Sequence, residues 1–271
     1  MNNDPVAIDL NVDAALLLKD LVGIDSYPSV LELFPNIYRI EDRDRVNAVV
    51  AAQLTEVGIL DEDGAHPIVE HWLQCLYRPD TELVARIVDT ESAAMRLLSL
   101  VRRGDSHVLA IRDGDHVVVQ AVFNEGEHLD VLAAALSAAL GPATAAGFES
   151  LTATLDQFAE VPADPAARRR ALIDLGATPQ TAAVITRALD EVTRRTEVLM
   201  IEHHDGVTPA LELSMAVLDT GSGRIVVVPI RDLSGQPHAI YLPGDEAGLR
   251  AGIRALAELL PGHSWFDTSR T

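Results

Sequence analysis

Residues 103–141 read RGDSHVLAIRDGDHVVVQAVFNEGEHLDVLAAALSAALG, and residues 221–262 read GSGRIVVVPIRDLSGQPHAIYLPGDEAGLRAGIRALAELLPG. Both stretches run in the same order: a strand-like segment, the tripeptide IRD, a turn, a second strand, an acidic turn with a glycine, and a helix rich in alanine and leucine that stops at glycine. Ile111 and Ile230, which open the two tripeptides, lie 119 positions apart. A matching order at such a spacing indicates two copies of one α/β unit.

The repeat extends upstream and divides the chain into halves. Gly58 and Gly176 each end a predicted helix and lie 118 positions apart. Strand-sized runs joined by tight turns, such as DGD at 113–115, favour an antiparallel meander. We therefore predict an α+β protein of two pseudo-symmetric units, residues 1–140 and 141–271, each a largely antiparallel meander with flanking helices. The units are expected to pack about a pseudo-twofold axis as one body.

The hydrophobic pattern predicts the individual elements. The predicted helices cover residues 14–22, 44–57, 67–77, 128–140, 165–175, 179–194 and 245–260. The predicted strands cover residues 27–33, 81–90, 95–102, 106–113, 116–123, 196–204, 209–219, 224–231 and 237–242. Asp13 is the predicted N-cap of the first helix. Pro229 interrupts one strand, which predicts a sheet edge or a bulge, and the apolar tail 263–266 is expected to pack down.

The composition limits the classes of partner that the protein is expected to bind. The 271 residues carry 21 basic and 41 acidic side chains, a net charge of −20, and Lys19 is the only lysine. An acidic surface repels phosphate backbones and anionic lipids, so nucleic acids and membrane surfaces are poor partners. We see no secretory leader and no apolar run near the roughly 18–20 residues that span a bilayer, so we expect a cytoplasmic protein. Cys75 stands alone, which argues against a disulfide framework and a cysteine-based metal site.

The sequence lacks the familiar motifs for catalysis and cofactor binding. It contains no GxxxxGK[ST] loop, no GxGxxG fingerprint, no HExxH pair and no GxSxG elbow. Glu202, His203 and His204 form the most suggestive cluster, but adjacent strand residues point to opposite faces and cannot easily share one metal ion. Cys75 is expected to be a small buried hydrophobe. We therefore expect no catalytic residue, cofactor or metal site. A small-molecule α/β enzyme is one alternative, and a homo-oligomeric scaffold pairing through an edge near Pro229 is another.

Apolar side chains alternate with small or polar ones along the predicted strand 209–219. The apolar face, expected to be core, comprises Leu211, Leu213, Met215 and Val217. The opposite face comprises Ala210, Glu212, Ser214 and Ala216. A flat face of short side chains lets a helix of another protein approach closely, which favours a docking surface. The alternative interpretation is an ordinary solvent-facing surface.

Four segments, in this order, carry a family resemblance: residues 26–28 (SYP), 103–112 (RGDSHVLAIR), 218–229 (LDTGSGRIVVVP) and 259–266 (LLPGHSWF). Together with the two-unit repeat, they resemble the EspG proteins of the mycobacterial ESX, or type VII, secretion systems, over nearly the whole chain. The resemblance implies a cytosolic chaperone without covalent chemistry. Such a chaperone binds the apolar tip of the PPE subunit in PE–PPE heterodimers, keeps them soluble and delivers them to the secretion machinery.

The resemblance further implies that the partner contacts the central sheet and the C-terminal helical region. The expected contact residues are Glu212, Ser214, Ala216, Val226 and Val228 on two neighbouring strands, with Asp113 and Asp115 of a loop and Arg250 and Arg254 of a helix at the flanks. Without a partner, the protein is expected to be a monomer or a weak homodimer. Components of the ESX machinery are further candidate partners.

Overall fold

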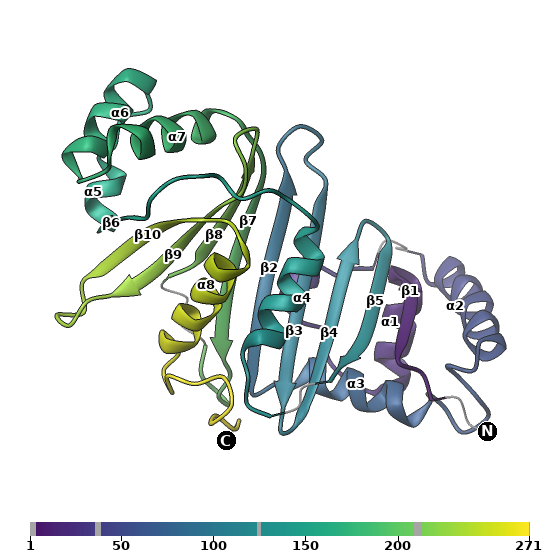
Figure 1. The fold of residues 1–271 in the computed structure, drawn as a ribbon. Helices are drawn as coiled ribbons and strands as arrows, with labels where there is room; N and C mark the ends of the chain where they lie inside the picture. The colour runs from purple at the N-terminus through teal and green to yellow at the C-terminus, as the bar shows by residue number, and fades with distance from the viewer. Residues whose placement is uncertain (1–3, 36–38, 124–125, 209–212, 271) are drawn as a thin grey trace.

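An antiparallel sheet runs through both halves of the chain (Figure 1). The structure, a computed structural model, describes residues 4–35, 39–123, 126–208 and 213–270. Within these residues, ten strands follow the spatial order β1-β5-β4-β3-β2-β7-β8-β9-β10-β6. The strands are β1 (Ala7–Asn11), β2 (Thr81–Asp89), β3 (Met95–Arg103), β4 (Ser106–Asp113), β5 (His116–Val122), β6 (Leu151–Thr154), β7 (Val192–Glu202), β8 (Met215–Thr220), β9 (Ile225–Arg231) and β10 (Pro237–Pro243).

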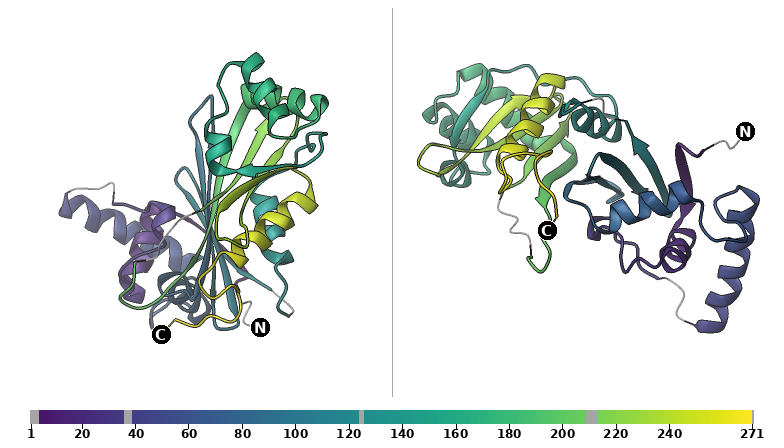
Figure 2. Two further views of the ribbon diagram at one scale, coloured as in Figure 1. Left: turned by 90° about the vertical axis from the view of Figure 1, so that its left-hand side faces the viewer. Right: turned by 90° about the horizontal axis from the view of Figure 1, so that it is seen from below.

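Helices lie on both faces of this sheet (Figure 2). They are α1 (Val12–Val22), the 3₁₀ turn η1 (Ser29–Leu31), α2 (Ile40–Glu56), α3 (Pro67–Tyr77), α4 (Asp130–Leu140), α5 (Leu155–Ala159), α6 (Pro165–Asp174), α7 (Pro179–Asp190) and α8 (Glu246–Glu258). Among the described residues, none of the helices combines the length and the apolar character needed to cross a membrane.

The strand order confirms the predicted repeat. Outward from the central pair β2 and β7, the first half follows the order β2-β3-β4-β5-β1 and the second half the order β7-β8-β9-β10-β6. Along the chain, each half has a first strand, three helices, a four-stranded meander and a closing helix. β2 and β7 pair over the whole of Thr81–Asp89, so the two halves share one sheet. The division of the chain at residues 140 and 141 stays a prediction.

Two apolar layers hold the helices to the sheet. One face, here called the α8 face, is covered by α4 and α8, whose buried Leu136 and Ile253 pack with strand residues of both halves. Met215 and Val217 lie in this layer, as the alternation predicts, and the tail packs down through the buried Trp265. On the other face, here called the α3 face, α1, α2 and α3 cover the first half, whereas α6 and α7 lie against the outer strands of the second.

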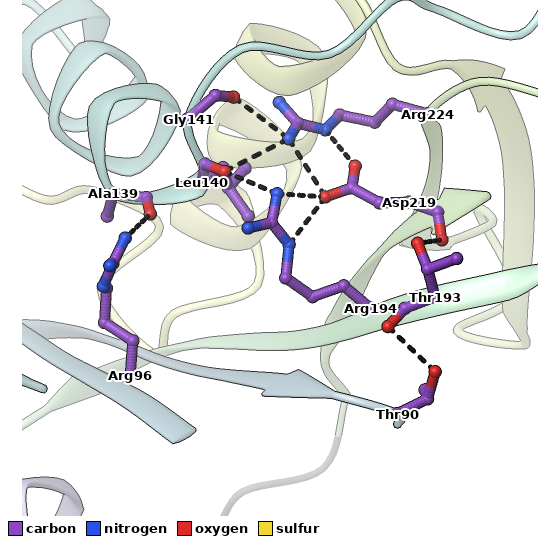
Figure 3. Close-up of polar contacts among 9 residues, drawn as sticks. All are labelled: Thr90, Arg96, Ala139, Leu140, Gly141, Thr193, Arg194, Asp219 and Arg224. Atoms are coloured by element: carbon purple, nitrogen blue, oxygen red, sulfur yellow. Dashed lines mark hydrogen bonds and ion pairs between the residues drawn. The ribbon is translucent and has the colours of Figure 1, made fainter. Parts of the chain in front are cut away.

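Arginine side chains close the carboxyl end of α4 (Figure 3). Arg96 donates to the carbonyl of Ala139 at 2.9 Å, and Arg194 donates to that of Leu140 at 2.6 Å. Arg224 donates to the carbonyl of Gly141 at 3.1 Å. Cations at this end of a helix satisfy its free carbonyl groups and interact favourably with its dipole. Because Arg194 and Arg224 come from the second half, they fasten it to the last helix of the first.

Some local predictions are wrong. The short edge strands β1 and β6, each directly before a helix, were not predicted. Residues 27–33, predicted as a strand, contain the 3₁₀ turn η1 instead, because the hydroxyl of Tyr27 donates to the carbonyl of Ala15 and ties this segment to α1. Asn11, and not Asp13, caps α1, since its side chain accepts from the N–H of Ala14 at 2.8 Å. Helix α7 also ends at Asp190, earlier than predicted.

Candidate docking site between β7, β9 and α8

The sheet splits where strand β8 begins. Among the described residues, the pairing of β8 with β9 stops at Ala216 and Val227. Strand β9 continues to Arg231 with β10 on its other side. Pro229, which has no N–H to donate, lies in this stretch without a β8 partner in the described residues. In the described residues, β9 is therefore an inner strand at its start and has an unpaired edge only near its end, around Pro229.

A cavity of about 630 Å³ lies at this split. Its size falls within the range of about 300–1,000 Å³ that is typical of ligand pockets. Most of the apolar residues that line it come from β7, β9, the end of α8 and the residues that follow α8, and they are Leu199, Met200, Ile201, Ile230, Ala255, Leu256, Leu259 and Leu260. Val207, Leu213 and Pro261 line it as well. Glu202, His204 and Glu258 add polar groups. A surface of this kind suits apolar side chains of a partner with a few polar neighbours.

The cavity adjoins a part of the α3 face that the helices leave uncovered. In the first half, α3 packs on β3, β4 and β5, whereas its counterpart α7 packs mainly on α6. As a result, Glu197 is exposed and Leu199 and Ile201 are only half-buried, while Val84, which pairs with Leu199, is buried. We call Glu197, Leu199, Ile201 and Ala216 the open face. Leu199 and Ile201 belong both to the open face and to the cavity, so the two surfaces are continuous.

Two histidines at the end of β7 confirm the predicted alternation of faces. The Nε2 atom of His203 lies 3.0 Å from the buried carboxylate of Glu82. The Nε2 atom of His204 lies 2.8 Å from the buried carboxylate of Glu202, which also accepts from the N–H of Gly262 at 2.7 Å. Within the described ranges, no group of three His, Cys, Asp or Glu side chains is placed to bind a metal ion.

The expected contact residues on the two neighbouring strands lie in different environments. Ala216 lies on the open face, and the half-buried Ser214 follows Leu213, which lines the cavity. Glu212 lies outside the described residues. Val226 and Val228 were expected on the outward face of the strand next to 209–219, and this is wrong, because they are buried on the α8 face with exposures of 0% and 2%.

The cross-strand register explains this error. Residues directly opposite each other on neighbouring strands share a face of the sheet. Val217 pairs with Val226, so both lie in the core, whereas Ala216 pairs with Val227. The β9 neighbour of Ala216 on the α3 face is therefore Val227.

The expected flanking residues do not gather around the cavity. Asp113 pairs with Arg96 at 2.7 Å, at the end of β4 far from the cavity, and Asp115 is exposed in the adjoining turn. Arg250 is exposed on α8 and pairs with Asp130 at 3.2 Å and with Glu246, and Arg254 is exposed on the same helix. A role for these four residues in binding stays a prediction.

Cys75 is placed as a core residue. Its side chain is fully buried on α3, with Sγ 3.6 Å from Nε2 of His71. Burial raises the pKa of the Cys75 thiol to about 11, and the charge of Asp80 adds to this effect while that of Arg103 opposes it. Since the thiolate is the nucleophilic form, Cys75 is not set up to attack a substrate at neutral pH.

The fold and the open face define an α+β protein with a candidate docking surface built on a sheet. The EspG family model matches residues 11–255, and the chain belongs to this family, as the resemblance implied. The chain is 32% identical over 268 residues to the ESX-1 secretion-associated protein EspG1 of Mycobacterium marinum, covering 98% of this chain and 92% of that protein. It is 29% identical over 268 residues to the ESX-3 secretion-associated protein EspG3 of Mycolicibacterium smegmatis, covering 97% and 90%.

A solved structure shows the same fold. The chaperone EspG5 of the Mycobacterium tuberculosis type VII secretion system, solved in complex with a PE25–PPE41 dimer, superposes with a TM-score of 0.80. The match covers 97% of this chain and all of the other, at 18% sequence identity. The fold class predicted from the repeat is thereby confirmed.

Proposed function

We propose that the chain is a cytoplasmic chaperone of type VII secretion. It binds the apolar tip of the PPE subunit in PE–PPE heterodimers, keeps the pair soluble and delivers it to the secretion machinery, without catalysis and without a cofactor. The observation that carries the proposal is the continuity of the open face with the cavity through Leu199 and Ile201. This surface joins the central sheet to the last helix, and the related EspG5 was solved with a PE25–PPE41 dimer.

The size of such an interface fits a chaperone. An exposed apolar tip of several hundred Å² is an aggregation hazard for a soluble protein. A standard stable interface buries about 800 Å² on each partner. If about 400 Å² of that area is apolar, its burial contributes roughly 10 kcal/mol at about 25 cal/mol per Å². Association entropy offsets much of this gain, which leaves an affinity that still allows release.

Co-expression tests the proposal. The chain is produced with PE–PPE pairs from the same genome, captured by a tag and analysed by size-exclusion chromatography. We expect a 1:1:1 complex with a pair that aggregates when it is produced alone. If every pair elutes separately from the folded chain, the proposal is wrong. Self-association of the chain alone would instead favour the homo-oligomeric scaffold.

A matched pair of variants tests where the partner binds. Ala216→Tyr places a bulky ring on the open face, whereas Ala138→Tyr places the same ring on the exposed side of α4. We expect Ala216→Tyr to abolish co-purification and Ala138→Tyr to preserve it, with both variants folded by circular dichroism. Equal capture by the two variants would place the partner elsewhere.

A further inference from the structure

A buried carboxylate fixes the orientation of one histidine beside the open face. Glu82 is 5% exposed, and one of its oxygens accepts a hydrogen bond from the hydroxyl of Ser99 at 2.7 Å. The other oxygen lies 3.0 Å from Nε2 of His203. Glu82 comes from the first half of the chain and His203 from the second, so the contact spans the central pair β2 and β7.

This geometry sets the tautomer of His203. A carboxylate accepts hydrogen bonds and donates none, so the imidazole nitrogen that faces Glu82 carries the proton. In the neutral ring the other nitrogen, Nδ1, then has a lone pair and is an acceptor. Among the described residues, Nδ1 of His203 has no hydrogen-bond partner, and it is not one of the buried unpaired atoms, so water reaches it.

The acceptor lies at the border of the apolar docking surface. His203 directly follows β7, and its contact with Glu82 places its ring on the α3 face, next to Leu199 and Ile201. Ile201 is also the direct cross-strand partner of Glu82. A partner that extends from Leu199 and Ile201 over the ring of His203 removes water from Nδ1.

We propose that His203 determines which partners the docking site accepts. Its Nδ1 accepts a hydrogen bond from a donor that lies next to the partner's apolar anchor residues, and Glu82 is the positioning residue that holds the ring. A lysine or arginine is the favoured donor, since the exposed Glu197 lies on the same face and the chain has a net charge of −20. This inference rests on the proposed function, because it assigns the selectivity of the same site.

The selectivity follows from desolvation. A partner without a hydrogen-bond donor at this place displaces the water from Nδ1 of His203 and offers no hydrogen bond in return. Leaving a buried acceptor unpaired weakens binding by about 10- to 100-fold. Discrimination based on hydrogen bonding is much sharper than discrimination based on apolar size alone.

The test measures dissociation constants for a PE–PPE pair that binds, and for the same pair with each lysine and arginine of the PPE tip changed in turn to methionine. These constants are determined for the unmodified chain and for His203→Phe, which keeps a ring but has no acceptor. His116→Phe, at an exposed position on β5, is the matched control. We expect one tip substitution to weaken binding to the unmodified chain by about 10- to 100-fold and to have no effect on binding to His203→Phe.

A second variant and a spectroscopic readout separate selectivity from folding. Glu82→Gln keeps the shape of the side chain but no longer requires a proton on Nε2 of His203. We expect the ¹⁵N shifts of His203 to report the Nε2–H tautomer in the unmodified chain, and this preference to weaken in Glu82→Gln.

The outcomes are distinct. If tip substitutions affect binding to the unmodified chain and to His203→Phe equally, the inference is wrong while the proposed function stands. The Nδ1–H tautomer or the doubly protonated ring at His203 would also overturn it, because Nδ1 would then be a donor. If no PE–PPE pair binds the unmodified chain, the proposed function fails and the inference fails with it.

Discussion

Arg224 and Asp219 form an ion pair inside the β8–β9 hairpin, with Nε of the arginine 2.6 Å from Oδ1 of the aspartate. The same guanidinium donates to the carbonyl of Gly141 at the end of α4. Only 3% of Arg224 is exposed, so both contacts are shielded from water. Because α4 closes the first half of the chain, this pair joins the two halves on the α8 face.

Removing Arg224 is expected to destabilise the fold. Arg224→Met leaves the half-buried Asp219 with Arg194 as its remaining arginine partner and frees carbonyl groups of α4. Breaking one side of a buried pair typically costs about 3–5 kcal/mol, and we expect about 3 kcal/mol in urea denaturation. Arg45→Met, which breaks an exposed pair with Asp42, should change stability by less than about 1 kcal/mol. Similar effects for the two variants would contradict the role given to Arg224.

The contact between Trp265 and His107 predicts a pH dependence of stability. The indole N–H of Trp265 donates to Nε2 of His107 at 3.1 Å, which requires that this nitrogen carry no proton. Burial is the main cause that lowers the pKa of His107. Because the unfolded chain then binds a proton more readily than the folded one, this contribution is present above about pH 6.5 and is lost as the pH falls below it.

The variant His107→Gln isolates this contribution. The free energy of unfolding is measured in urea between pH 8 and pH 5 for the unmodified chain and for the variant. The unmodified chain should lose more stability on acidification, with an extra slope of at most about 1.4 kcal/mol per pH unit. Parallel curves for the two proteins would show that His107 does not titrate in this range.

The thiol of Cys75 is expected to be unreactive in the folded chain. It is fully buried, and burial raises its pKa to about 11. Iodoacetamide should therefore leave the native protein unmodified at pH 7.5 and label it fully in 6 M guanidinium, as measured by intact mass. Rapid alkylation of the native chain would reopen the alternative in which Cys75 is a nucleophile.

A charge on the open face should block docking without unfolding the chain. Leu199→Glu introduces a carboxylate into the half-buried surface that a partner would cover. We expect the dissociation constant for a PE–PPE pair to rise at least about 100-fold, because central apolar anchors carry most of the binding energy. Leu233→Glu, at a position fully exposed at the tip of the β9–β10 hairpin, should leave binding unchanged. The reverse pattern would move the site to that hairpin.

The repeat in the sequence predicts most of the fold because each copy consists largely of β-hairpins, which local sequence patterns indicate. In each half, four strands and a closing helix follow one another along the chain. Short turns join β2 to β5 and β8 to β10, and those local signals predict these strands, whereas residues 203–214 separate β7 from β8. The edge strands β1 and β6 are different. Each has only four or five residues and pairs with a strand remote in the sequence, so no local pattern indicates it.

The candidate docking site is harder to predict, because it depends on the register of the strands and on which part of the sheet the helices leave uncovered. Alternation along one strand correctly separates Ala216 from Val217, but it does not give the offset to the next strand, and Val226 and Val228 were therefore assigned to the wrong face. Pro229 is the one sequence signal that points to the split. Leu199 and Ile201 are left uncovered because α7 packs mainly on α6, and no local sequence pattern specifies the position of α7.

Hydrogen–deuterium exchange of the chain with and without a bound PE–PPE pair shows whether the partner docks at the split. The N–H of His203 donates to the carbonyl of Asp80, directly before β2, so alternation directs the N–H groups of Met200 and Glu202 toward the split. We predict slower exchange in the complex at residues 199–202 of β7 and 255–260 at the end of α8, with no change in β1. Protection confined to the β1–β5 edge, with β7 and α8 unchanged, would contradict docking at this site.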